Sequence, residues 1–100
     1  MVSEKNTKIT ITLDASNWQT PKDFYVDYCA STRAPKWFGN NLDALEDSLR
    51  GGICELTPEK IIIKNLSKKI IGLVGEKFFT TVNSICLDNS VELEIYFEFI

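Results

Sequence analysis

Histidine is absent from this chain of 100 residues, and cysteine, proline and glycine are scarce. Without histidine the usual general base of enzyme catalysis is missing, and no cysteine lies near a visible acid–base partner in the sequence. The spacings that are typical of metal sites, paired histidines or Cys-x-x-Cys, are missing as well. We therefore expect a protein that is not an enzyme and that binds neither a metal nor a cofactor.

Cysteine occurs at positions 29, 54 and 86 alone. An odd number at wide spacings does not build a disulfide framework, so we expect Cys29, Cys54 and Cys86 to be reduced and packed as small apolar groups, with a single bridge such as Cys29–Cys86 as the alternative. No apolar run approaches the roughly 20 residues of a membrane helix, and residues 1–7 lack the apolar stretch of a secretory signal. We expect a cytoplasmic protein with a frayed tail at residues 1–6.

Basic residues are too few and too scattered for binding to nucleic acid. Eleven Lys and Arg stand against 14 Asp and Glu, which gives a net charge of −3 and a pI near 4.9. Phosphates require clustered Lys and Arg, and the one basic doublet, Lys68-Lys69, fits the surface of a helix. An acidic chain suits a basic protein partner better. We therefore expect a protein partner, no nucleic acid and no membrane.

What is present is a succession of amphipathic segments. The expected order is a strand at 7–13, a helix from Pro21, a helix at 41–50, a strand at 59–65, helices at 68–73 and 76–87, and a strand at 91–100. Successive strands are too far apart for hairpins, which indicates parallel pairing through helical crossovers. The first and last strands have one polar face, so helices should cover one face of the sheet alone. We predict one α/β domain over residues 1–100, with a three-stranded parallel sheet in the order 1-2-3 and about four helices on one face.

Charge on the uncovered face supports that strand order. Lys60 and Lys64 fall on the polar side of the middle strand, and acidic residues fall on the polar side of the last strand, at Glu92, Glu94 and Glu98. Opposite charges on neighbouring strands contribute about 0.2–1 kcal/mol a pair, and less when exposed. The core side of the last strand is predicted to carry Val91, Leu93, Ile95, Phe97 and Phe99.

The most specific stretch of the chain runs from residue 34 to residue 52. Asn40 or Asn41 can cap a short helix there, and the paired Gly51-Gly52 supplies the left-handed stop. Leucines fall on one stripe of this helix, and on the opposite side lie Asp43, Glu46, Asp47 and Arg50. Asp43 faces Glu46 and Asp47 at like-charge spacings that each cost about 0.2–0.5 kcal/mol. From charge alone, an ordinary solvated face is the simpler interpretation of this surface.

The same stretch resembles the segment that marks the barstar family, small intracellular inhibitors of secreted bacterial ribonucleases. The matching positions are Pro35, Trp37, Phe38, Gly39, Asn41, Leu42, Asp43, Ala44, Leu45, Asp47, Leu49 and Gly51. The resemblance implies a three-stranded parallel sheet with helices on one face, an exposed Trp37 and a more buried Phe38. It implies a surface that binds a basic ribonuclease or related toxin, with candidate contact residues Asp43, Asp47, Trp37, Asn41, Glu46, Arg50 and Gly51.

Departures from the family pattern indicate a different partner from that of barstar. Barstar has aromatic residues where Glu46 and Gly52 stand, and an acidic contact near the position of Ser84. The leading hypothesis is an inhibitor of the immunity or antitoxin type, monomeric when free, that blocks the basic active site of a ribonuclease. The alternatives are a barstar-like interaction module that regulates a partner other than a ribonuclease and, more remotely, hydrolysis by a carboxylate pair.

Overall fold

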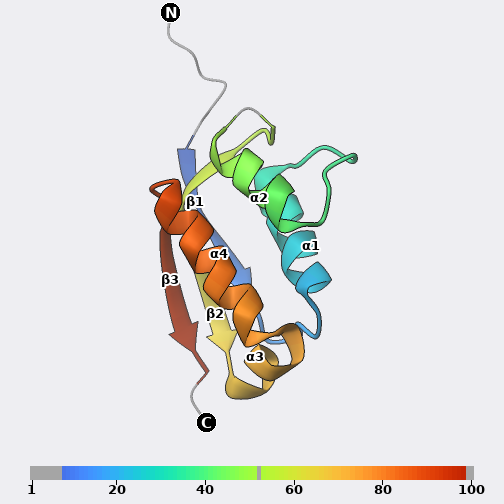
Figure 1. Ribbon diagram of the computed structural model, residues 1–100, viewed down its shortest axis with the longest axis vertical. Coiled ribbons are helices and arrows are strands. Elements are labelled where there is room, and N and C mark those ends of the chain that lie inside the picture. The colour runs from blue at the N-terminus through green and yellow to red at the C-terminus, as the bar shows by residue number, and fades with distance from the viewer. Residues whose placement is uncertain (1–7, 52, 99–100) are drawn as a thin grey trace, which may run out of the picture.

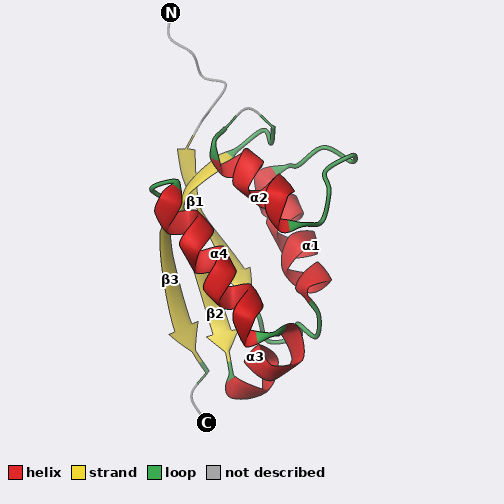
Figure 2. Ribbon diagram, in the orientation of Figure 1, coloured by secondary structure: helices red, strands yellow, loops and turns green. Residues whose placement is uncertain are grey.

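The computed structural model describes residues 8–51 and 53–98. The elements follow one another as β1 (Lys8–Asp14), α1 (Pro21–Thr32), α2 (Leu42–Leu49), β2 (Thr57–Leu66), α3 (Lys68–Val74), α4 (Glu76–Asp88) and β3 (Glu92–Phe97). The expected tail at residues 1–6, the second glycine of the helix stop, Gly52, and the last two residues of the expected third strand lie outside the described residues. The predicted order of strands and helices is confirmed (Figure 2).

The three strands form one parallel sheet in the order β1-β2-β3, as predicted. The helices pack against one face of it, where α4 lies in front of β2 (Figure 1). The alternation of side chains explains this arrangement, since Ile11 and Leu13 of β1 and Ile61 and Ile63 of β2 are buried beneath the helices. Thr10, Thr12 and Asp14, which alternate with the buried residues of β1, are exposed. The fold is therefore a two-layer α/β sandwich with one uncovered sheet face.

The uncovered face carries the predicted charge pairing between β2 and β3. The ammonium group of Lys60 lies 3.4 Å from a carboxylate oxygen of Glu94 and 3.8 Å from one of Glu92. Glu92, the larger influence, and Glu94 together raise the pKa of Lys60. The hydroxyl of Tyr96 donates a hydrogen bond to Glu94 and is the main reason that the pKa of Glu94 is lowered. These contacts help to set the strand order, although solvent keeps each of them weak.

An aromatic cluster fills the space between α1, α4 and the sheet. Phe24 is completely buried and its ring meets Tyr25, Tyr28 and Phe78 edge-on or stacked, with centroids 5.4–5.8 Å apart. Trp18 is buried against Phe24 and donates its indole N–H to Asp27 at 2.7 Å. The aromatics of α1 are thus packing residues, and they hold the layer on which α2 rests.

The cysteines are free thiols, as expected for reduced, packed side chains. Cys54 and Cys86 are buried in the core, and Cys29 is half-buried at its margin. Burial raises the pKa of the Cys86 thiol to about 11. Cys54, which follows α2 in the chain, is therefore a core residue and not a surface group.

Several element boundaries differ from the prediction. β2 begins at Thr57, before the expected residue 59, and α2 is shorter than the predicted 41–50. The larger correction concerns β3, which ends at Phe97, and Phe97 is 53% exposed where a core residue was predicted. The pairing of β2 with β3 shifts register between Ile63 and Leu66. Beyond that shift, Phe97 lines an open groove with Leu66 at the end of the sheet.

Among the described residues, no single helix is long and apolar enough to cross a membrane. Together, α3 and α4 have the length and composition of a span, but the pair is bent by 88°. Their apolar residues Ile70, Val74, Val82 and Cys86 are buried in the core against the sheet.

Candidate functional site

The loop before α2 separates two neighbouring aromatic residues. Phe38 is 8% exposed and packs on the ring of Tyr28, with centroids 6.2 Å apart. Trp37 is 74% exposed. The predicted division between a buried Phe38 and an exposed Trp37 is confirmed. An indole that stays in solvent while its neighbour anchors the loop is a large apolar surface that is available for contact.

The start of α2 is fixed by Asn41, one of the two predicted caps. Asn41 has an extended backbone, and its side-chain oxygen accepts a hydrogen bond from the N–H of Ala44 at 2.8 Å. Gly39 leaves room for this cap, because a Cβ at position 39 would lie 2.7 Å from the side-chain nitrogen Nδ2 of Asn41. The side-chain oxygen of Asn41 is therefore used within the helix, and the role of Asn41 at the candidate surface is to position α2.

The inner face of α2 is held against α1 by a buried polar contact that the sequence did not reveal. The hydroxyls of Ser48 and Tyr28 are 2.7 Å apart, and Ser48 also donates to the carbonyl of Leu45 at 2.7 Å. Because Ser48 has one hydroxyl hydrogen, Tyr28 must be the donor to Ser48. Burial is the main cause that raises the pKa of Tyr28 far above its usual range. Leu45 and Leu49 complete this inner face.

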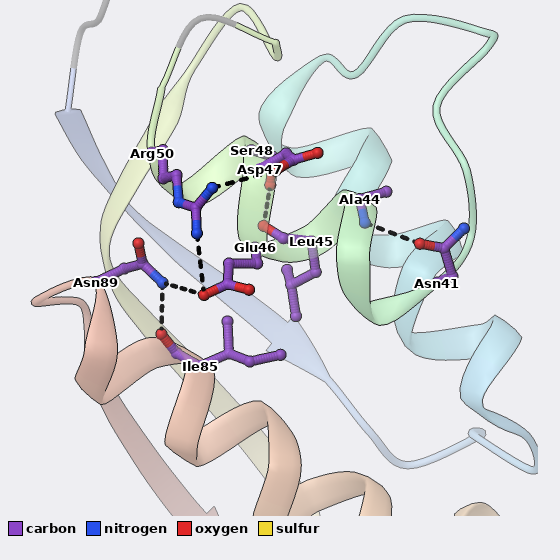
Figure 3. A network of polar contacts seen from close by, with 9 residues as sticks. All are labelled: Asn41, Ala44, Leu45, Glu46, Asp47, Ser48, Arg50, Ile85 and Asn89. Carbon is purple, nitrogen blue, oxygen red and sulfur yellow. Dashed lines mark hydrogen bonds and ion pairs between the residues drawn. The ribbon is translucent and has the colours of Figure 1, made fainter.

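The outer face of α2 carries the predicted acidic surface. Asp43 and Asp47 are both exposed, and the side chain of Asp47 is 57% accessible. The guanidinium of Arg50 lies 3.6 Å from Asp47 and 3.5 Å from Glu46, between the two carboxylates (Figure 3). Within residues 8–51 and 53–98, no cation forms an ion pair with Asp43. The helix therefore presents one unpaired carboxylate and one that is loosely paired.

Glu46 belongs to the side of this surface that meets α4. Its side chain is 33% exposed, and the amide of Asn89 donates to Glu46 at 3.5 Å and to the carbonyl of Ile85 at 2.9 Å (Figure 3). No role for Asn89 was predicted from the sequence. No local signal was available, since Glu46 and Asn89 are 43 residues apart.

The end of α2 and the exposed surface of α4 account for the remaining candidate positions. Gly51 has φ of 94°, the left-handed conformation that favours glycine, and its N–H donates to the carbonyl of Ser48 at 3.1 Å. It therefore ends the helix as predicted. Ser84 is exposed on α4. In the part of the chain that the structure describes, no group of three His, Cys, Asp or Glu residues is arranged to hold a metal ion.

Comparison with known proteins gives one informative match. No curated protein matches the sequence. The family model described as Barstar (barnase inhibitor) matches residues 9–92, which include α1, α2, α3, α4 and β2 in full. The chain belongs to the barstar family. The three-stranded parallel sheet and the helices on one face of it agree with the architecture that the resemblance implied.

Within this barstar-family fold, α2 combines a fixed inner face with an anionic outer face. Tyr28 of α1 contacts Ser48, and Asn89, which follows α4, contacts Glu46. Trp37 lies in the loop that leads into the same helix. Such a surface can offer carboxylates to cationic groups of a partner without rearranging its own backbone, which lowers the entropy cost of binding.

Proposed function

We propose that this protein binds a ribonuclease and blocks its basic active site with the outer face of α2. The observation that carries the proposal is the presentation of Asp43 and Asp47, exposed, on a helix that is packed on its other face, in a chain of the barstar family. Exposed like charges on one helix face cost stability, so a binding role gives a reason for their presence.

The carboxylates would act as substitutes for the phosphates of RNA. A ribonuclease collects Arg, Lys or protonated His groups around the scissile phosphate, and carboxylates form short, charge-assisted hydrogen bonds to such groups. The net charge of −3 would also steer a basic enzyme toward the inhibitor before contact. Trp37, exposed beside α2, supplies an apolar anchor of the kind that dominates many interfaces.

The cellular role that follows is immunity. An inhibitor in the cytoplasm would protect the cell that produces a secreted ribonuclease until the enzyme is exported. Glu46 is polar where barstar has an aromatic residue, and it is engaged with Arg50 and Asn89. This departure favours a related ribonuclease or toxin over barnase itself, and it also supports the second candidate, a module that binds a partner other than a ribonuclease.

The test is inhibition of RNA cleavage by a panel of purified basic bacterial ribonucleases that includes barnase. We expect stoichiometric inhibition of at least one enzyme, with affinity that falls steeply as salt is added. Asp47→Asn and Asp43→Asn should each weaken the complex by about 2–5 kcal/mol if the carboxylate is buried against a cation at the interface.

Glu92→Gln is the matched control for that experiment. It removes one negative charge from the uncovered face of the sheet, which is the face opposite to the helices. We expect it to change affinity little, and none of the three variants should alter the free energy of unfolding by more than about 0.5 kcal/mol. Absence of inhibition across the panel would remove the ribonuclease hypothesis and favour the second candidate, whereas binding without inhibition would show that the outer face of α2 does not block the active site.

A further inference from the structure

Arg50 occupies the position on Asp47 that the proposed function assigns to a cation of the partner. Its guanidinium lies 3.6 Å from Asp47 and belongs to the residue three positions later, directly after the end of α2. A partner Arg that bound both carboxylate oxygens of Asp47 would have to displace it. Asp43 has no such competitor among the described residues. The two exposed carboxylates of α2 are therefore not equivalent in the free protein.

Glu46 gives Arg50 a second acceptor. The other terminal nitrogen of the guanidinium lies 3.5 Å from Glu46, so Arg50 can leave Asp47 and keep an opposite charge beside it. Asn89 donates to the same oxygen of Glu46 from the end of α4. This contact comes from the residue that follows α4, so it ties the Glu46 carboxylate to another part of the fold and favours its position beside Arg50 (Figure 3).

We propose that Arg50 is an internal competitor for Asp47 and that Glu46, positioned by Asn89, is the residue that receives Arg50 when a partner cation takes Asp47. This inference rests on the proposed function, because it concerns the same surface of α2. Glu46 is then a positioning residue that sets how much of Asp47 is available and need not contact the ribonuclease.

The proposal has a quantitative form. If a fraction f of the molecules has Asp47 free of Arg50, the apparent dissociation constant is the intrinsic constant divided by f. Removing the charge of Glu46 leaves Asp47 as the one carboxylate near Arg50, so f decreases. Removing Arg50 brings f to one, so the charge of Glu46 no longer influences how much of Asp47 is available.

The experiment is a double-mutant cycle of Glu46→Gln and Arg50→Gln, measured against the ribonuclease of the panel that is inhibited most strongly. In the presence of Arg50, Glu46→Gln should weaken binding by about 1.5- to 5-fold, which is the range for an exposed ion pair. In the Arg50→Gln background the same change should have a clearly smaller effect, limited to the loss of long-range steering. Arg50→Gln alone should strengthen binding.

Asn89→Ala and Asp43→Asn serve as controls within the cycle. Asn89→Ala should weaken binding when Arg50 is present and have no effect in Arg50→Gln, whereas a purely structural role of Asn89 would weaken binding equally in both backgrounds. Asp43→Asn should act equally in both backgrounds, because Arg50 does not pair with Asp43. Urea unfolding of every variant separates changes in binding from changes in folding.

The outcomes distinguish this inference from the function on which it rests. Lack of inhibition by the unaltered protein overturns both. If the protein inhibits a ribonuclease but Glu46→Gln weakens binding equally with and without Arg50, the proposed competition of Arg50 for Asp47 is wrong and the proposed function stands. Weaker binding by the Arg50→Gln variant would also contradict the proposed competition, because it would indicate that Arg50 contacts an acidic group of the ribonuclease.

Discussion

At the scale of single residues, Ser48 connects α2 to the core. Its hydroxyl donates to Leu45 within α2 and accepts from Tyr28 of α1, both at 2.7 Å. The contact lies in a fully buried layer, where an unpaired hydroxyl is costly. The position of the acidic face of α2 therefore depends on a hydrogen bond beneath it.

Replacing Ser48 should test this connection. Ser48→Ala leaves the Tyr28 hydroxyl buried without a partner, and we expect a loss of about 1–3 kcal/mol in the free energy of unfolding. Tyr28→Phe removes a hydroxyl whose partner keeps its bond to Leu45, so the expected loss is about 0.5–1.5 kcal/mol. Urea unfolding of both variants and the double variant provides the measurement. If the two losses simply add, the hydrogen bond does not couple the helices.

At the scale of elements, α2 is short, and its boundaries are set by its caps. Asn41 closes its first turn and Gly51 its last. A helix of this length is marginal in isolation, so it depends on these caps and on the leucines that it buries. The cap therefore affects stability and also the direction in which Asp43 and Asp47 project.

We expect Asn41→Ala to lower the free energy of unfolding by about 0.5–2 kcal/mol, because the N–H of Ala44 loses its partner. Asn41→Asp should preserve most of the stability, since a carboxylate can accept the same bond. Hydrogen exchange at the amide of Ala44 reports the cap directly and should accelerate in Asn41→Ala. The matched control is Asn40→Ala, at the exposed neighbouring position, and an equal loss there would contradict the assignment of the cap.

Local chemistry made much of α2 predictable from the sequence. Asn41, Gly51 and the leucine stripe act within a few residues of one another, so their pattern is visible without a structure. The contact of Asn89 with Glu46 and that of Tyr28 with Ser48 join residues 43 and 20 positions apart, and no periodicity encodes them. The alternation of β3 predicted Phe97 to be buried. That prediction was wrong because the alternation does not show where the helices stop covering the sheet.

At the scale of the whole molecule, the buried thiol of Cys86 should make the free energy of unfolding decrease at alkaline pH. Burial raises the pKa of Cys86 from 9.0 to about 11, so the unfolded chain loses this proton at lower pH than the folded protein. A group with a raised pKa stabilises the fold fully below its unfolded value, and this contribution is lost as the pH rises through the folded value. The stabilising effect of Cys86 should therefore be complete below about pH 9 and decline toward pH 11.

Urea unfolding between pH 8 and pH 11 can measure this decline. The free energy of unfolding should decrease more steeply with pH in the unaltered protein than in Cys86→Ala, although the variant is less stable at every pH because of the cavity it creates. Cys29→Ala, at the margin of the core, is the comparison variant, and because burial also raises the pKa of the Cys29 thiol, it should remove a smaller part of the decline than Cys86→Ala does. Parallel curves for the unaltered protein and Cys86→Ala would show that Cys86 does not titrate in this range.

The parallel sheet also bears on when the acidic surface of α2 takes its final geometry during synthesis. Ile11 pairs with Ile61, fifty positions later, and Ile61 pairs in turn with Leu93. Such distant pairings form slowly, because loop entropy is lost before the contacts compensate for it. A nascent chain that has emerged from the ribosome as far as Gly51 carries every carboxylate of α2 but lacks Asn89 and the sheet beneath it. The acidic surface therefore acquires its final geometry only near the end of translation.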